Sequence, residues 1–175
     1  AAAGYDPYSR DFADAGVLSA RYDCVIAQDV LEHGADPHAL MDRLDALVAP
    51  GGMIAVGTPN AAGIDLADTE RHVHPLHQPY HRHIFSLPAL KRAAADRSWE
   101  TRRVYMSPYT NMPLLSLPFM HHYMQSNDGT LEVLFERSCS RWFWLDPATW
   151  FIFFFGYFLC DDADILAVFR KRPET

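Results

Sequence analysis

Residues 22–60 read YDCVIAQDVLEHGADPHALMDRLDALVAPGGMIAVGTPN, and this stretch decides the fold. Its two short apolar runs, 22–27 and 53–57, are typical of buried β-strands. Between them, apolar side chains recur at the spacing of one helix face, namely Leu40, Met41, Leu44, Leu47 and Val48. Two buried strands joined by an amphipathic helix predict a right-handed β-α-β unit with parallel strands.

Boundary signals stand at both ends of the predicted helix. Asp36 is suited to cap its first turn, and Pro37 fits the first helical position. We expect Pro50-Gly51-Gly52 to end the helix and turn the chain, which is a structural role. In open α/β sheets, ligands bind beyond the carboxyl ends of the strands. The residues that follow the two strands, 28–33 and 58–60, are therefore the first candidates for a binding site.

The rest of the chain predicts a single domain over 1–175, with a core of 1–107 and 163–175 and a helical insertion over 108–162. A polar connection over 61–85, rich in His and Pro, follows the second strand, and connections of this length are often functional. After it we expect a helix from Ser86 to Ala95, a strand over 101–106, two or three helical segments in the insertion and a last strand over 164–170.

Composition excludes several classes of protein. The chain has 175 residues, 49% of them hydrophobic and 21% charged, which is an ordinary globular composition. Its formal net charge of −7 argues against a nucleic-acid partner. The three cysteines have no metal or redox spacing, which favours a reducing, cytoplasmic compartment. The longest apolar run, Trp150 to Cys160, is too short to span a bilayer.

The pieces of residues 22–60 also occur together in one known family. An apolar strand, LEH, a helix, then a leucine shortly before PGG, and TPN after the next strand follow in this order, and HRHIFS comes later. This pattern resembles the class I S-adenosylmethionine-dependent methyltransferases. The resemblance implies a Rossmann-like α/β sheet and S-adenosylmethionine as cofactor. In that family a first strand and a Gly-rich loop would precede Ala1, so we expect the sheet to be incomplete at the N-terminus.

The resemblance also implies cofactor-binding residues. Tyr5 and Asp6 are similar to the end of the family's second strand, where a carboxylate accepts hydrogen bonds from the ribose hydroxyls. The alternative is that Asp6 only forms a turn before Pro7. Gln28 and Asp29 would line the cofactor pocket at the end of the 22–27 strand.

The most conspicuous polar feature is a group of five histidines, His72, His74, His77, His81 and His83. Imidazole is a common metal ligand, but the group lacks HExxH or any other defined ligand spacing, so we predict no metal site. A general base on the substrate side is the favoured function, with His81 or His83 preferred and His33 as a third candidate. Loop histidines that only bond backbone or carboxylates are the structural alternative.

Aromatic residues dominate the end of the insertion, at Trp142-Phe143-Trp144 and over 150–158. We expect them to pack as a helical cap over the core. Alternatives are a wall of an apolar substrate pocket or contact with a membrane surface, which the missing basic face disfavours. We expect the insertion to cover the strand carboxyl ends and to form, with the histidine segment, a pocket for an apolar or aromatic small molecule.

The predicted function is methyl transfer from S-adenosylmethionine to an O, N or C atom of a small molecule, with O-methylation slightly favoured. Two alternatives stay open. The first is a non-catalytic binding protein with a methyltransferase fold. The second is a metal-dependent enzyme that uses the histidine-rich segment.

Overall fold

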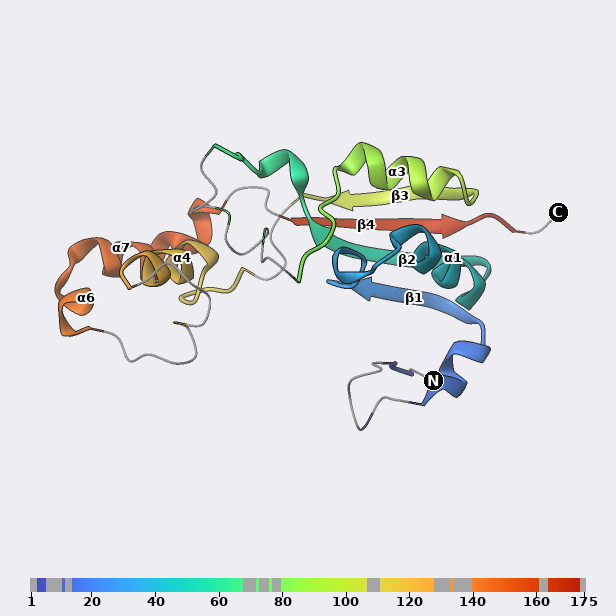
Figure 1. Cartoon of the computed structure of the whole chain (residues 1–175), viewed down its shortest axis with the longest axis horizontal. Coiled ribbons are helices and arrows are strands. Elements are labelled where there is room, and N and C mark those ends of the chain that lie inside the picture. Colours follow the sequence, from blue (N-terminus) through green and yellow to red (C-terminus); the bar gives the residue numbers. More distant parts are fainter. Residues whose placement is uncertain are drawn as a thin grey trace.

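The computed structural model describes residues 3–5, 11, 14–67, 72, 76, 80–106, 111–127, 133, 140–160 and 164–173. Its centre is a four-stranded sheet with the order β1-β2-β4-β3 (Figure 1). The strands are β1 (Tyr22–Gln28), β2 (Val48–Pro59), β3 (Trp99–Tyr105) and β4 (Asp164–Lys171). β1 and β2 are parallel, and β4 runs antiparallel to both of its neighbours, β2 and β3. The α/β fold and the parallel β-α-β unit that the sequence predicted are confirmed.

Two helices begin at the boundaries that the sequence predicted, after Asp36 and at Ser86. The side chain of Asp36 accepts a hydrogen bond from the backbone of Ala39, and Ser86 does the same for Ala89. The helices are η1 (Ala15–Ser19), η2 (Leu31–His33), α1 (Pro37–Leu47), η3 (Ala61–Gly63), α3 (Leu87–Ala95), α4 (Leu117–Gln125), α6 (Arg141–Leu145), α7 (Pro147–Phe155) and η5 (Gly156–Leu159).

The Pro-Gly-Gly segment differs from its prediction, because it lies inside β2 and not in a separate turn after the helix. β2 already pairs with β1 at Val48, and it advances to Met53 while β1 advances only from Tyr22 to Cys24. The extra residues form a bulge, in which Gly51 has a φ of 77°. A Cβ on Gly52 would lie 2.9 Å from the carbonyl oxygens of Asp23 and Ala49. The bulge therefore requires glycine at both positions.

The hydrophobic core lies between one face of the sheet and the helices α1 and α3 (Figure 1). Alternate residues of β2 and β4 point into it, as the period of two requires, whereas in β3 a register shift between Thr101 and Arg103 separates the core residues Trp99 and Val104. The fully buried core side chains are Leu31, Met41, Val48, Ile54, Val56, Leu90, Ala94, Ile165, Ala167 and Phe169.

The burial predicted for the first strand is correct for only one of its faces. Ala27 is buried and Val25 packs against the core, but Cys24 is exposed and Ile26 is 69% exposed. β1 lies at the edge of the described sheet, and α1 and α3 both cover the face opposite to Ile26. The prediction failed because an apolar run gives no information on whether both faces of a strand are covered.

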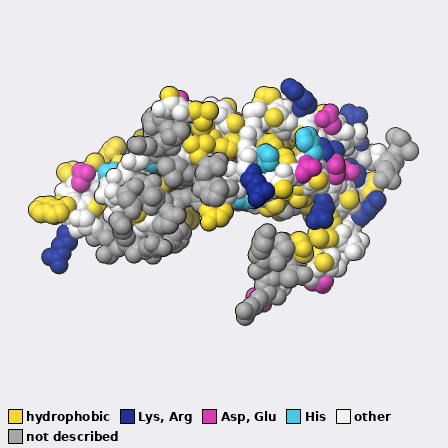
Figure 2. All heavy atoms as spheres, viewed as in Figure 1, with side chains coloured by type: hydrophobic (Ala, Val, Ile, Leu, Met, Phe, Trp, Pro, Cys, Tyr) yellow, Lys and Arg dark blue, Asp and Glu magenta, His cyan; other side chains and the backbone are white. Residues whose placement is uncertain are grey.

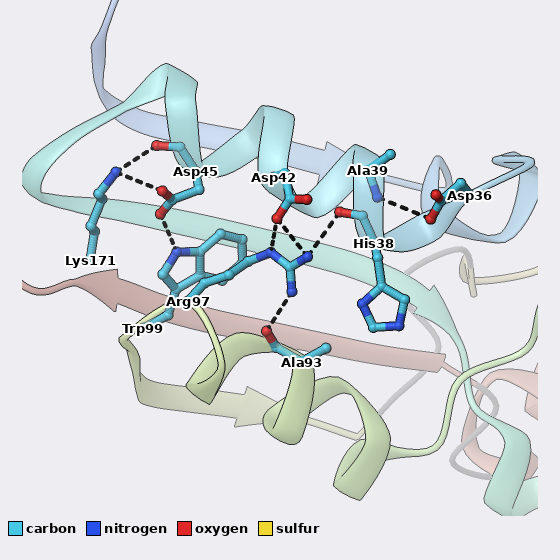
Figure 3. Close-up of polar contacts among 9 residues, drawn as sticks. All are labelled: Asp36, His38, Ala39, Asp42, Asp45, Ala93, Arg97, Trp99 and Lys171. Atoms are coloured by element: carbon cyan, nitrogen blue, oxygen red, sulfur yellow. Dashed lines mark hydrogen bonds and ion pairs between the residues drawn. The ribbon is translucent and has the colours of Figure 1, made fainter.

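A polar network connects α1 to the start of β3 and the end of β4 (Figure 3). The Asp45 carboxylate accepts hydrogen bonds from Trp99 Nε1 (2.6 Å) and from Lys171 Nζ (3.0 Å), which also donates to the Asp45 carbonyl. Asp42 lies one turn before Asp45 on α1, and its carboxylate forms an ion pair with Arg97 at 2.7 Å. These contacts connect α1 with the segment after α3, with β3 and with β4.

Replacing Asp45 with alanine is expected to lower the free energy of unfolding by about 1–3 kcal/mol, because it leaves the buried Trp99 N–H without its acceptor. Urea denaturation measures the change. Asp42→Ala is the matched control on the same helix. Its side chain is 68% exposed, so the loss there should stay below about 1 kcal/mol. Equal losses in the two variants would show that the Asp45 contacts contribute no more than a surface ion pair.

The helices between β3 and β4 form a separate group beyond the sheet (Figure 1). Phe119 of α4 is buried at their centre, with its ring 6.0 Å from that of Phe143 and 5.2 Å from that of Phe153. Much of the remaining apolar surface is uncovered, although we expected it to be buried against the core. Hydrophobic side chains reach the outer end of the group (Figure 2), and exposed ones include Leu114, Leu115, Trp142, Trp150, Phe151, Phe154, Tyr157 and Phe158.

The aromatic side chains of the helical group stay exposed because α7 is apolar on all sides. Its buried residue is Thr149, and among the described elements it contacts α4, α6 and η5, so most of its aromatic side chains point elsewhere. Among the described helices, none has the length and hydropathy that crossing a membrane would require.

Candidate functional site

The parallel strands β1 and β2 end at the same edge of the sheet, and polar residues gather there. Asp29 follows β1 and leads into η2, while Asn60 follows β2 and caps η3. The segment 80–85 runs past this edge. Its Phe85 forms a parallel bridge with Asn60, and the Phe85 carbonyl accepts a 2.9 Å hydrogen bond from the backbone of Ala61. This segment thereby brings the end of the histidine group to the strand ends.

Main-chain hydrogen bonds fix the histidine segment against η2. The backbone N–H groups of Arg82 and His83 both donate to the carbonyl oxygen of Glu32, at 2.7 and 3.2 Å. On the other side, His33 Nδ1 lies 3.0 Å from the carbonyl oxygen of Tyr80. Since a carbonyl only accepts, Nδ1 is the protonated nitrogen and donates this bond. The result is that His81 lies next to Glu32 and His33, far from both in the sequence.

We call Glu32, His33 and His81 the edge cluster. One ligand atom from each of these residues lies within 4.8 Å of the others. The rings of His33 and His81 meet edge to face, with their centroids 4.8 Å apart. Glu32 and His81 are buried, whereas His33 is exposed. The cluster thus combines two imidazoles and a carboxylate, with one member open to solvent.

Glu32 is the most unusual member of the cluster, because its side chain is fully buried. Thr58 donates a 3.4 Å hydrogen bond to Oε2, but no partner for Oε1 lies in the part of the chain that the structure describes. Desolvation by burial raises the pKa of Glu32 to about 7, and the charge of Asp29 adds to the rise, while its own backbone hydrogen bond, His33 and Thr58 oppose it. A carboxyl with this pKa can exchange a proton near neutral pH.

The three predicted base candidates have different surroundings. His33 and His81 belong to the edge cluster. His83 is only half-buried, and its ring lies 6.3 Å from that of Phe85. Of the other histidines, His72 accepts a hydrogen bond from the backbone of Asp65 through Nε2, as a loop histidine would. His74 and His77 lie outside the described residues.

Of the predicted cofactor residues, Gln28 and Asp29 lie at the carboxyl end of β1, and both are exposed. Asp29 has a φ of 53°, in the left-handed region that few residues other than glycine adopt, and its backbone donates to the Gly57 carbonyl at 3.0 Å. Such backbone strain is often found at functional sites. Tyr5 is exposed and lies in irregular backbone, and Asp6 lies outside the described residues.

The sequence analysis named His33 as a base candidate but assigned no chemistry to Glu32. Thr58 was expected at this edge, but its bond to Glu32 was not. No local pattern shows which of the five loop histidines reaches Glu32.

Comparison with known proteins gives a family. A sequence model described as a methyltransferase domain matches residues 1–104. The matched part includes β1, α1, β2 and α3, and also η2 and the 80–85 segment, which carry the edge cluster. The sequence matches none of the curated proteins with which it was compared.

Two of the solved structures to which this chain is similar have methyltransferase titles, and both have low sequence identity to it. A "putative sarcosine dimethylglycine methyltransferase" from Galdieria sulphuraria is 19% identical, with a TM-score of 0.47 over 87% of this chain and 54% of its own. Phosphoethanolamine N-methyltransferase 2 from Haemonchus contortus, in complex with phosphomonomethylethanolamine and S-adenosylhomocysteine, is 17% identical, with a TM-score of 0.46 over 87% of this chain and 34% of its own. The chain thus spans about half the length of the first structure. Because the family match covers more than half of the sequence, this chain belongs to the family of S-adenosylmethionine-dependent methyltransferase domains.

Proposed function

We propose that the protein transfers the methyl group of S-adenosylmethionine to a small-molecule acceptor, with a hydroxyl oxygen as the favoured acceptor atom. The observation that carries the proposal is the family match over 1–104, which contains the ends of β1 and β2 and the edge cluster. In this proposal Gln28 and Asp29 face the cofactor, and the edge cluster faces the acceptor. The three cysteines have no metal or redox spacing, which suits a cytoplasmic enzyme.

The reaction determines what the cofactor and the protein each contribute. The sulfonium carries the reactivity, so the protein mainly has to align donor and acceptor in line. Transfer to a neutral hydroxyl also has to remove a proton, for which a group with a pKa near 7 is well matched. Glu32 has such a pKa, and the imidazoles of His33 and His81 lie beside it. This combination supports transfer to a hydroxyl oxygen.

The acceptor side has a second component in the helices between β3 and β4. β4 starts opposite the end of β2, with Pro59 paired to Asp164, and the end of β3 pairs with β4 at Tyr105 and Leu166. The helical group therefore leaves and re-enters the sheet at the edge that carries the edge cluster. Its uncovered aromatic side chains support a lid that binds an apolar or aromatic acceptor and excludes water.

Deleting residues 111–160 and restoring a short linker is expected to raise the KM for the acceptor at least about tenfold, because the apolar wall is lost. The pairing of Tyr105 with Leu166 gives the design, since a hairpin-like linker can close this gap. The affinity for S-adenosylmethionine serves as the internal control and should not change. A trimmed enzyme with an unchanged KM would contradict the lid.

Replacing Asp6 with alanine is expected to weaken S-adenosylmethionine binding by about 1–3 kcal/mol, the cost of losing the acceptor for the ribose hydroxyls. Titration calorimetry measures the affinity. Asp23→Ala removes an exposed carboxylate of β1 and is the matched control, for which we expect no change. If the two variants bind equally well, Asp6 has only a role in a turn.

The decisive experiment for the proposed function uses S-adenosylmethionine labelled in its methyl group and a panel of aromatic alcohols and amines of similar size. Label is expected in the alcohols, with one equivalent of S-adenosylhomocysteine formed for each methyl group transferred. Cofactor binding without transfer to any acceptor would favour the alternative of a non-catalytic binding protein.

A further inference from the structure

We propose that the edge cluster is a binding site for a divalent transition-metal cation, with Glu32, His33 and His81 as its three protein ligands. Two imidazoles and one carboxylate are a common ligand set for Zn²⁺. This site goes beyond methyl transfer, because a cation can bind there with neither S-adenosylmethionine nor an acceptor present.

The geometry of the edge cluster is close to that of a loaded site. One ligand atom from each residue lies within 4.8 Å of the others. Tetrahedral Zn²⁺ with bonds of about 2.0–2.2 Å needs separations of about 3–4 Å between ligand atoms, so a small rotation of the side chains is enough. His33 is exposed and can make this adjustment, while the bonds from Arg82 and His83 to Glu32 keep the two backbone segments in place.

The hydrogen bond of His33 supports the same assignment. Because Nδ1 donates to the Tyr80 carbonyl at 3.0 Å, a neutral His33 ring carries its lone pair on Nε2. Histidine ligands of metals typically donate their other N–H to a carbonyl or a carboxylate, which fixes the tautomer and the ring orientation. His33 already has this arrangement without a metal.

Glu32 provides an independent observation. Its side chain is fully buried, and Oε1 has no hydrogen-bond partner among the described residues. Burying a carboxylate oxygen without a partner is costly unless a cation or a donor meets it. Zn²⁺ held by His33 and His81 would satisfy this oxygen.

The chemistry of such a site fits its place at the strand edge. Three protein ligands leave at least one coordination position for water or for an oxygen of a small molecule. A bound cation would lower the pKa of a hydroxyl in that position. The sequence predicted no metal site, because spacing rules were applied to the loop histidines alone and the ligand pair Glu32-His33 lies outside that segment.

The test is calorimetric titration of the full chain with ZnCl₂, without cofactor or acceptor. We expect binding of one equivalent, with the affinity lowered at least about tenfold in Glu32→Gln, His33→Ala and His81→Ala. His38→Ala removes an exposed imidazole of α1 outside the edge cluster and should leave the affinity unchanged. Cobalt(II) gives a second readout, since its visible absorption should report bound nitrogen ligands in the wild type and change in His33→Ala.

Several outcomes would overturn the site. They are no binding heat for the wild type, unchanged affinity in His33→Ala, and a loss in His38→Ala equal to that of the cluster variants. Circular dichroism shows which variants fold. His33 is exposed, so His33→Ala keeps the test valid even if His81→Ala does not fold. Metal binding and methyl transfer are measured separately, so the failure of one proposal leaves the other intact.

Discussion

Replacing His81 with glutamine is expected to lower kcat for methyl transfer by about 10²–10⁴-fold, the usual contribution of a positioned acid–base group. His81 is buried beside Glu32 at the strand ends, where the proposed acceptor loses its proton. The KM for S-adenosylmethionine should stay near the wild-type value, because Gln28 and Asp29 remain in place.

His83→Gln is the matched control, since His83 lies two residues away on the same segment. Its ring is near Phe85 and outside the edge cluster, so we expect a loss of less than about tenfold in kcat. Steady-state kinetics on both variants decide between the two histidines that the sequence could not separate. A larger loss in His83→Gln would assign the proton transfer to His83.

Replacing Phe169 with alanine is expected to lower the free energy of unfolding by about 3–5 kcal/mol. Phe169 is fully buried on β4 and lies opposite Ile54 of β2 and Thr101 of β3, with its ring 5.9 Å from that of Trp99. Removing it leaves a cavity in the middle of the sheet, and a loss of this size is a large part of the stability of a typical domain. Urea denaturation followed by circular dichroism measures it.

Phe158→Ala is the control for the loss of an aromatic ring as such. Phe158 is 78% exposed at the end of η5, so its removal should change the free energy of unfolding by no more than about 0.5 kcal/mol. A loss similar to that of Phe169→Ala would mean that the exposed aromatic surface is covered in solution and contributes to stability.

The elements that the sequence predicted well are those with local signals. The caps at Asp36 and Ser86 and the apolar face of α1 depend on residues within one or two turns, and the structure confirms them. The start of β2 and the exposure of Ile26 depend on partners elsewhere in the chain. Local patterns contain no information on which strand is at an edge or on how a glycine pair is accommodated in a bulge.

In the candidate site, too, the sequence predicts the features that have local signals and not those that depend on distant contacts. The positions of Gln28 and Asp29 at the end of β1 follow from the strand pattern and the rule that ligands bind at carboxyl ends. The edge cluster joins Glu32 to His81 across a connection that the sequence leaves without predicted structure. Main-chain hydrogen bonds between distant segments, such as those from Arg82 and His83 to the Glu32 carbonyl, bring His81 there, and no local pattern predicts them.

The position of β4 has a consequence for how the protein folds during synthesis. β4 is the last strand in chain order, yet it lies in the interior of the sheet, where it pairs with both β2 and β3. Until residues 164–171 have left the ribosome, β3 lacks its described partner and the β-α-β unit has to persist with β2 exposed along one side. Contacts between segments so distant in sequence form slowly. The nascent chain therefore passes through a period in which an apolar strand edge is open to chaperones or to other chains.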